Sequence, residues 1–246
     1  MPLQTIVPRR LYRQIADQLR QLIERGEFPV GARLPPERDL AVQLGVSRPS
    51  VREALIALEV EGWVEVRMGS GIYVCPRPAG TVRRVTAEAP LETIRARQLI
   101  ESELAAQAAR QMKKAQIAGL RDAISVMEDA VTAGHMPTHG DRLFHVRIAE
   151  AGGNSVLLRI VSELYDERHN PLFEQLGSHF ETTRSWSTAI AEHRAVVDAI
   201  AARSPQAARD AMSHHLNSSH SRFTANWSGD ADAAVVRRVG TRKTAA

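Results

Sequence analysis

The feature that most constrains the fold is a pair of short helical patterns separated by a tight turn. Residues 36–44 and 48–61 repeat apolar side chains at the spacing of an amphipathic helix. Gly45 is placed to end the first helix, and Ser47 is placed to cap the start of the second. Two helices joined by a short turn that contains glycine form a helix-turn-helix.

The hydrophobic period changes after Gly62. Residues 63–67 alternate between apolar and polar side chains, residues 68–71 supply turn residues, and residues 72–74 return to a strand pattern. This order predicts a two-stranded hairpin. Because a further amphipathic helix is predicted at residues 11–25, the N-terminal part has the element order of a winged helix-turn-helix domain.

The remainder of the chain shows helical patterns only. We therefore predict a mainly α protein with a winged helix-turn-helix domain at 1–75, a linker at 76–89, an all-helical domain at 90–225 and a disordered tail at 226–246. The predicted linker is rich in proline, glycine and arginine, and the tail is polar and aperiodic. The helices expected in the second domain span residues 91–112, 115–133, 140–151, 155–169, 183–202 and 205–224.

The composition excludes several classes of protein. A chain of 246 residues is long enough to bury two modest cores. The first ten residues lack the apolar region of a signal peptide, and no run of about 18 apolar residues could span a membrane. The single cysteine, Cys75, cannot form an intrachain disulfide. We expect a cytoplasmic protein that does not insert into a membrane.

The charge distribution indicates how such a chain could bind nucleic acid. The net charge is +4, and residues 1–75 carry 10 arginines against 9 acidic residues. The predicted winged helix is therefore not a strongly basic surface. If it binds DNA, it must do so by placing particular arginines rather than by bulk charge.

Several polar residues gather at the start of the second helix of the helix-turn-helix, which lies in the major groove in such domains. Arg48 and Arg52 are four residues apart, so we expect them to project from one face, away from the apolar stripe. An arginine can pair with guanine O6 and N7, while Ser47 and Ser50 can bind phosphate. Arg38, on the preceding helix, is placed to reach the same groove or its backbone. The alternative is that these arginines only solvate an exposed face.

The predicted hairpin tip carries two glycines. Gly69 and Gly71 would allow the backbone to approach a minor groove closely, because glycine has no side chain to obstruct it. The alternative is that they serve the turn alone.

Four residues of the second domain could bind a divalent metal. Asp141 and His145 are spaced to leave one face of a helix together. His193 and His215 lie in apolar stripes, where a metal would occupy a ring nitrogen. The alternative for each histidine is a hydrogen-bonded core residue.

About 65 residues of the predicted N-terminal domain resemble a known family. The segment LPPERDLAVQLGVSRPSVREALIALEVEGWVEVRMGSGIYV is similar to the winged-helix signature of the GntR family of bacterial regulators. The resemblance implies a homodimer that binds a short palindrome in double-stranded DNA. Pro49 replaces a threonine that is frequent at its position in the family. The DNA contacts that the resemblance implies are made by Arg38, Arg48, Arg52, Pro49, Ser50 and Gly69.

The second domain resembles the FCD effector domain of the FadR subgroup of this family. The segments DRLFHVRIAEAGGN, EHRAVVDAI and AARDAMSHHL are similar to three landmarks of that domain. The resemblance implies an all-helical bundle that holds Zn²⁺, Ni²⁺ or a similar ion, which helps to bind a small carboxylate. The ligands that it implies are Asp141, His145, His193 and His215.

The same resemblance indicates an effector. The segment IRARQLIESELAAQAAR is similar to the first helix of the FCD domain, in which Arg97 would hold the effector carboxylate. The alternative for Arg97 is an ion pair with Glu101, one turn along the helix. The segments RRLYRQIADQLRQLIERG and EALIALEVEGWVEVRMGSGIYV are similar to regulators of hexuronate catabolism, so a sugar acid is the first expectation.

Together these observations predict a repressor that a small carboxylate releases from DNA by favouring one of two dimer arrangements. Two alternatives remain at this point. One is a metal-dependent enzyme with a DNA-binding appendage, although four protein ligands leave little room for catalysis on a tetrahedral ion. The other is a regulator whose metal only braces the helical domain.

Overall fold

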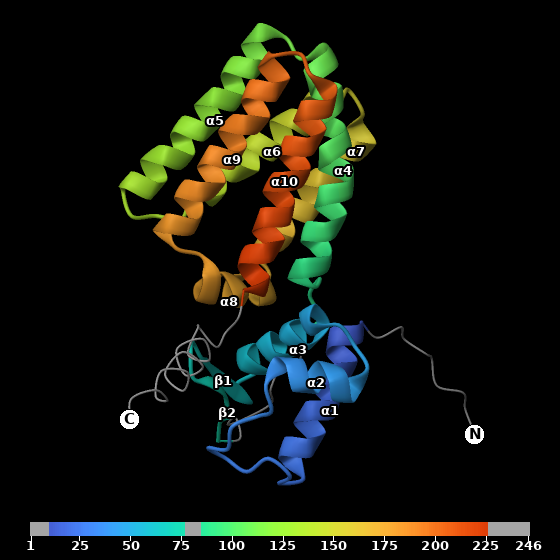
Figure 1. Cartoon of the computed structure of the whole chain (residues 1–246), viewed down its shortest axis with the longest axis vertical. Coiled ribbons are helices and arrows are strands. Elements are labelled where there is room, and N and C mark those ends of the chain that lie inside the picture. The colour runs from blue at the N-terminus through green and yellow to red at the C-terminus, as the bar shows by residue number, and fades with distance from the viewer. Residues whose placement is uncertain (1–9, 77–84, 226–246) are drawn as a thin grey trace, which may run out of the picture. The chain divides into compact units, whose positions relative to one another are not determined.

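The computed structural model describes residues 10–76 and 85–225 (Figure 1). The predicted tail at 226–246 and most of the predicted linker lie outside the described residues. The chain divides into two compact units, of which the first ends at Thr86 and the second spans Ala87–Thr224. The prediction of a mainly α protein, with a helix-turn-helix and a small wing followed by a helical domain, is confirmed.

The first unit consists of three helices and a two-stranded wing. Its elements are α1 (Leu11–Glu24), α2 (Glu37–Leu44), α3 (Arg48–Val60), β1 (Val64–Arg67) and β2 (Gly71–Val74). Helix α1 packs against α3, and Ile15, Leu19 and Leu55 are among the side chains that this packing buries. The wing strands are antiparallel, with Val64 opposite Val74.

The turn between α2 and α3 has the predicted chemistry. Gly45 ends α2 in the left-handed conformation with φ of 66°, where a side chain would be strained. Ser47 caps α3, because its hydroxyl accepts a hydrogen bond from the backbone N–H of Ser50 at 3.3 Å.

The segment before α2 belongs to the wing, although its sequence predicted only a loop. The N–H of Gly31 donates to the carbonyl of Val74 at 2.9 Å, and the N–H of Leu34 donates to the carbonyl of Ile72 at 2.8 Å. These bonds satisfy backbone groups on the outer edge of β2.

Two residues of the predicted linker are bound to the first unit. The N–H of Val85 donates to the Glu61 carboxylate at 3.0 Å, and Arg10 donates to the carbonyl of Thr86 at 2.9 Å. These two residues therefore have fixed partners.

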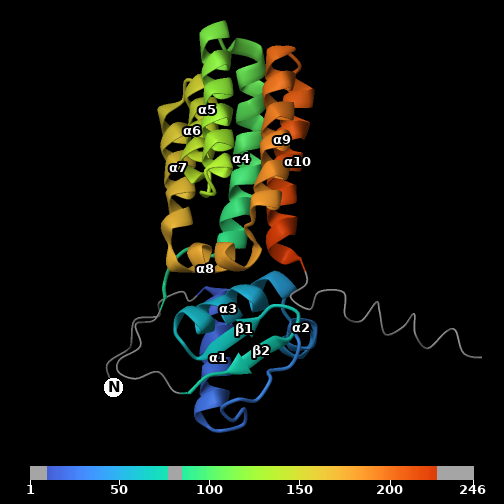
Figure 2. The same ribbon diagram turned by 90° about the vertical axis from the view of Figure 1, so that its left-hand side faces the viewer.

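The second unit is a bundle of helices. Its elements are α4 (Pro90–Gln111), α5 (Lys114–Thr132), α6 (Thr138–Ala151), α7 (Ser155–Asp166), the 3₁₀ helix η1 (Glu167–His169), α8 (Pro171–Phe180), α9 (Thr183–Ala201) and α10 (Pro205–Thr224). Figure 2 shows the long helices side by side, with the short α8 lying across one end of the bundle. Helix α4 packs along α10, and α5 packs along α6 and α9.

Helix α8 was not among the predicted helices. It has only 10 residues, begins at Pro171 and is capped by Asn170, whose side chain accepts a hydrogen bond from the N–H of Phe173 at 2.9 Å. Its length leaves too few repeats for the helical period to stand out in the sequence.

The core of the second unit is apolar, and a small set of buried polar residues lies within this bundle. The apolar part includes Leu104, Leu120, Phe144 and Val196. Among the described helices, none is both long and apolar enough to cross a bilayer. The buried polar side chains of the unit are Thr93, Arg97, Glu101, Ser102, Asp141, His145, His193 and His215.

Candidate metal centre and DNA-contacting surface

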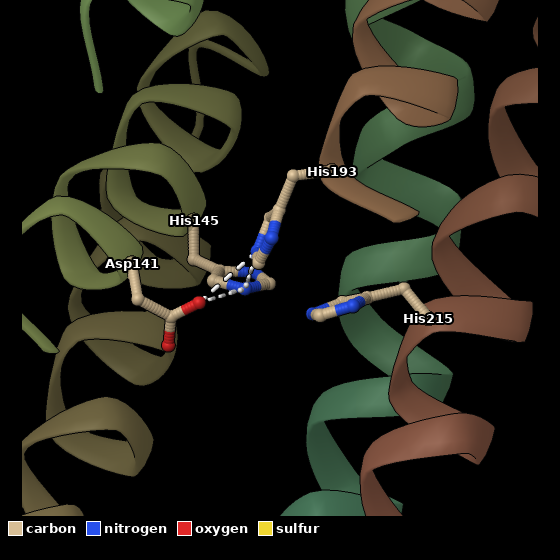
Figure 3. A group of neighbouring side chains, drawn as sticks. All are labelled: Asp141, His145, His193 and His215. Atoms are coloured by element: carbon tan, nitrogen blue, oxygen red, sulfur yellow. Dashed lines mark hydrogen bonds and ion pairs between the residues drawn. The ribbon is translucent and has the colours of Figure 1, made fainter. Parts of the chain in front are cut away.

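The four residues predicted as metal ligands lie together inside the second unit (Figure 3). Helix α6 supplies Asp141 and His145, α9 supplies His193, and α10 supplies His215. One ligand atom from each residue lies within 4.8 Å of those of the other three, and all four side chains are buried. Asp141 and His215 are 74 positions apart in the sequence, so the fold brings distant residues into one compact cluster.

Each imidazole of the cluster is oriented by an acceptor at Nδ1. Such an acceptor places the ring proton on Nδ1 and leaves the Nε2 lone pair for a metal, as is usual around protein metal ions. The acceptors are a Glu101 carboxylate oxygen for His145, the backbone carbonyl of Ala189 for His193 at 2.7 Å, and a Glu192 carboxylate oxygen for His215 at 2.9 Å.

The atoms that face the centre of the cluster are all acceptors. Nε2 of His145 lies 3.4 Å from Nε2 of His193, and Asp141 Oδ1 lies 3.0 Å from the same His193 atom. Lone pairs and a carboxylate at such distances repel one another unless a cation lies between them. One carboxylate oxygen and three imidazole nitrogens are a donor set that suits Zn²⁺ or Ni²⁺. The residues therefore fit a divalent metal.

The protonation states agree with this fit. Burial would raise the pKa of Asp141, but the imidazoles of His145 and His193 that face its carboxylate outweigh burial and hold the pKa well below its usual value. Burial lowers the pKa of His193 and, more strongly, that of His215. A charged aspartate beside neutral histidines is the ligand state that a metal requires.

His145 differs from the other two histidines. Burial alone would lower its pKa, but the negative charge of Glu101 more than offsets this and raises it. Glu101 is itself buried, which would raise its pKa, yet the charges of Arg97 and His145 lower that pKa to about 2. The cluster thus favours a positive charge at its centre, either as a proton on His145 or as a bound metal.

Arg97 forms the ion pair that the sequence offered as the alternative, and it also lines a cavity. Its Nε donates to Glu101 at 2.7 Å, which is the expected pair one turn along the helix. Its side chain also lines a cavity beside Asp141 and His215. The empty space of this cavity, including the part that is open to solvent, is about 430 Å³.

Several residues of this site could not be found from sequence spacing. Tyr165 donates a hydrogen bond from its hydroxyl to Asp141, and burial keeps the pKa of that hydroxyl well above its usual value. Glu192, which precedes His193 on α9, meets His215 only in the fold, and Arg168 of η1 reaches the cavity only there. The one local signal was the acidic Glu192 directly before His193.

The DNA-contacting residues predicted in the first unit lie at one end of the helix-turn-helix and at the wing tip. The side chains of Arg38 and Arg48 are 78% and 48% exposed. Pro49 and Ser50 are half-buried in the first turn of α3, and Ser47 before it is exposed.

Arg52 departs from the expectation of an exposed face. Its side chain is 1% exposed, and both Nε and Nη2 donate to the Glu37 carboxylate, at 3.1 and 2.7 Å. Arg48 lies on the same side, with its Nε 3.6 Å from the other oxygen of Glu37. The four-residue spacing placed the two arginines on one side correctly, but packing against α2 buries the second.

The wing tip contains the two predicted glycines. Gly69 has φ of 76°, and no atom lies within 4 Å of where its Cβ would stand. At Gly71 a Cβ would come within 2.4 Å of the Arg33 side chain. With φ of 125°, Gly71 is therefore favoured by the backbone of the wing itself, whereas Gly69 lies at the open tip.

Comparison with known proteins identifies both units. Residues 11–74 match the family described as bacterial regulatory proteins, gntR family, and residues 92–218 match the FCD domain. The chain is 40% identical to the Exu regulon transcriptional regulator of Escherichia coli (strain K12), over 85% of this chain and 83% of that protein. It is 37% identical to the Uxu operon transcriptional regulator of the same strain, over 84% of each.

Solved structures show the same fold. The structure of E. coli McbR/YncC is 22% identical, with a TM-score of 0.50 over 89% of this chain and 98% of that one. The relatives are named as transcription regulators, so the alternative of a metal-dependent enzyme is set aside. The chain belongs to the GntR family of bacterial transcription regulators, in the group that carries a C-terminal FCD domain.

Proposed function

We propose that this regulator is a homodimeric repressor that leaves a palindromic operator when a small carboxylate binds at a metal site in its second unit. The observation that carries the proposal is the convergence of Asp141 and three histidines beside a cavity lined by Arg97. A sugar acid is the first candidate, because the N-terminal segments resemble regulators of hexuronate catabolism and the relatives include the Exu and Uxu regulators.

The metal site would be formed by Asp141, His145, His193 and His215 around Zn²⁺, or around Ni²⁺ or a similar ion. A bound ion supplies a Lewis acid that attracts a carboxylate oxygen. Arg97 contributes a second positive group beside it, held in place by its bond to Glu101.

DNA contacts would come from the exposed end of the helix-turn-helix and from the wing. Arg48 reads a base edge, Arg38 contacts bases or phosphate, and the start of α3 with Ser47, Pro49 and Ser50 binds the backbone. Gly69 lets the wing tip approach the DNA closely.

Arg52 is buried, so we expect it to support the DNA-contacting surface without touching DNA itself. Its two bonds to Glu37 fix the carboxylate that also faces Arg48. We expect Arg48→Ala to weaken binding to the operator by about 1–3 kcal/mol and to reduce discrimination against mutated operators. Arg52→Ala should weaken binding while leaving more of that discrimination intact. Undiminished, sequence-selective binding after both changes, in a folded protein, would contradict the assignment of this surface.

The response to an effector can be tested by fluorescence anisotropy of a labelled operator duplex. Sugar acids and hydroxy acids are added to the Zn²⁺-loaded protein, and operator affinity is expected to fall about 5–150-fold with the effector. His193→Ala is the control, since it removes a proposed ligand and should abolish the response without changing the first unit. A metal-loaded protein that ignores every carboxylate would favour a purely structural metal.

A further inference from the structure

Three buried hydrogen-bond donors in the second unit have no acceptor. They are Nη2 of Arg97, Nε of Arg168 and Nε1 of Trp186, and they account for all buried side-chain polar atoms without a partner in the described part of that unit. The side chains of all three residues line the cavity beside the metal cluster. Buried donors without partners are costly, so a cavity with three of them is built for a ligand rich in acceptors.

The part of the cavity lining that contains Arg168 is rigidly held. The Arg168 side chain is 9% exposed and donates from Nη2 to Glu181 at 2.5 Å. Its guanidinium carbon lies 5.2 Å from the ring centre of Phe173 and 5.6 Å from that of Trp186. Arg168 therefore cannot turn freely to find another acceptor, and its Nε stays available at the cavity.

The charges around the cavity indicate how many negative groups the ligand carries. Three lining arginines are each paired with a glutamate and so add no net charge, which leaves Asp141 as the other acidic side chain of the lining. A divalent metal reverses this balance to a single positive charge, which one carboxylate would neutralise. The pairs are Arg97 with Glu101, Arg168 with Glu181, and Arg222 with Glu192.

We propose that Arg168 and Trp186 form a second subsite that binds the hydroxyl and ring oxygens of a sugar acid with a single carboxylate. This inference rests on the proposed function, in which the carboxylate lies at the metal and Arg97. The second subsite supplies two N–H donors, and the nearby Ser219 hydroxyl and Glu181 carboxylate can accept ligand hydroxyl protons. A short hydroxy acid fills only the metal end, and a dicarboxylate brings one charge too many.

The test is calorimetric titration of the full-length, Zn²⁺-loaded protein with D-galacturonate, L-lactate and galactarate. These probes have one carboxylate with a hydroxylated ring, one carboxylate with a single hydroxyl, and two carboxylates on the same number of carbons. We expect wild-type protein to bind galacturonate at least about tenfold more tightly than galactarate. Equal or tighter binding of galactarate would overturn the single-charge part of the inference.

The subsite itself is tested with Trp186→Phe, which removes the indole N–H and keeps an aromatic ring. The affinity for galacturonate should fall about fivefold, the loss of one hydrogen bond, while the affinity for lactate stays within about twofold. Trp63→Phe is a matched control, because Trp63 also carries a buried indole N–H without a partner but lies in the first unit. It should change neither affinity.

A second variant guards against a purely structural effect. Arg168→Lys keeps the positive charge beside Glu181 but removes the Nε donor, and it should give the same selective loss for galacturonate. Equal losses for galacturonate and lactate, or no loss in either variant, would overturn the second subsite while leaving the proposed function standing. If wild-type protein binds none of the carboxylates, the proposed function falls as well.

Discussion

The two units of this regulator bury charged groups in different ways. In the first unit, Arg13 donates to Asp17 at 3.1 Å and pairs with Glu61, so opposite charges meet inside the fold. In the second unit, Asp141 faces His145 and His193, whose lone pairs point toward it. The first arrangement is complete within the protein, whereas the second requires a cation.

The buried atoms without partners differ in the same way. In the first unit Nε of Arg13, Nε of Arg20 and Nε1 of Trp63 lack a partner, and both arginines already bind Asp17 through another nitrogen. In the second unit all three atoms are donors around one cavity. The comparison therefore predicts that the metal and the effector bind to the second unit and stabilise it.

The largest expected effect is stabilisation of the second unit by metal. With Zn²⁺ at about 1,000 times its dissociation constant, the free energy of unfolding should rise by about 4 kcal/mol. Hydrogen exchange read by mass spectrometry should show slower exchange in α6, α9 and α10, with little change in α1 and α3. His193→Ala should remove this protection. Equal protection in both units would contradict the distinction drawn between them.

A smaller effect is expected from the carboxylate that orients His145. Glu101→Gln should lower Zn²⁺ affinity about 10–100-fold, because it weakens the acceptor at Nδ1 of His145. The pKa of Glu101 is about 2, so this acceptor is charged throughout the range in which histidines titrate. Competition with a chromophoric chelator would measure the affinity.

The same helix offers a matched control for that change. Glu103 is two residues away, but it is exposed and pairs with Arg209 at the surface. Glu103→Gln should leave Zn²⁺ affinity within about twofold, since an exposed pair of this kind contributes little. If the two variants lose affinity equally, the role assigned to Glu101 is wrong.

Much of the fold could be predicted because its elements have strong local patterns. The change of hydrophobic period after Gly62 indicated the wing, and the apolar stripes indicated most helices of the second unit. The pairing of Gly31 with Val74 was missed, because a short stretch beside an existing hairpin carries no period of its own.

The candidate site was predictable only in part. Asp141 and His145 share a helix, so their spacing placed them together. His193 and His215 were candidates from their apolar stripes, but only the family resemblance joined them to that pair. Arg168 and Tyr165 reach the cavity and the cluster by contacts between distant segments, which no local spacing encodes. The burial of Arg52 was missed for the same reason, since it depends on Glu37 of another helix.

The smallest expected effects come from helix caps, one in each unit. Ser47→Ala removes the hydroxyl that accepts from the N–H of Ser50, and Asn154→Ala removes the amide oxygen that accepts from the N–H groups of Val156 and Leu157. Each change should cost about 1 kcal/mol of stability in its own unit, measured by hydrogen exchange. Only Asn154→Ala should alter protection in α7, and neither should change Zn²⁺ affinity by more than about twofold.

Variants of Ser47 also test the proposed DNA contact of its hydroxyl. If Ser47 acts only as a cap, Ser47→Gly should restore most of the lost stability and operator affinity together, since glycine is a tolerated cap. If the hydroxyl also binds phosphate, stability returns with glycine while operator affinity stays low and its dependence on salt is unchanged, because a neutral contact releases no counterion. A fall in Zn²⁺ affinity with either Ser47 variant would show that the two units share their stability, which is the outcome that the contrast between their buried charges does not predict.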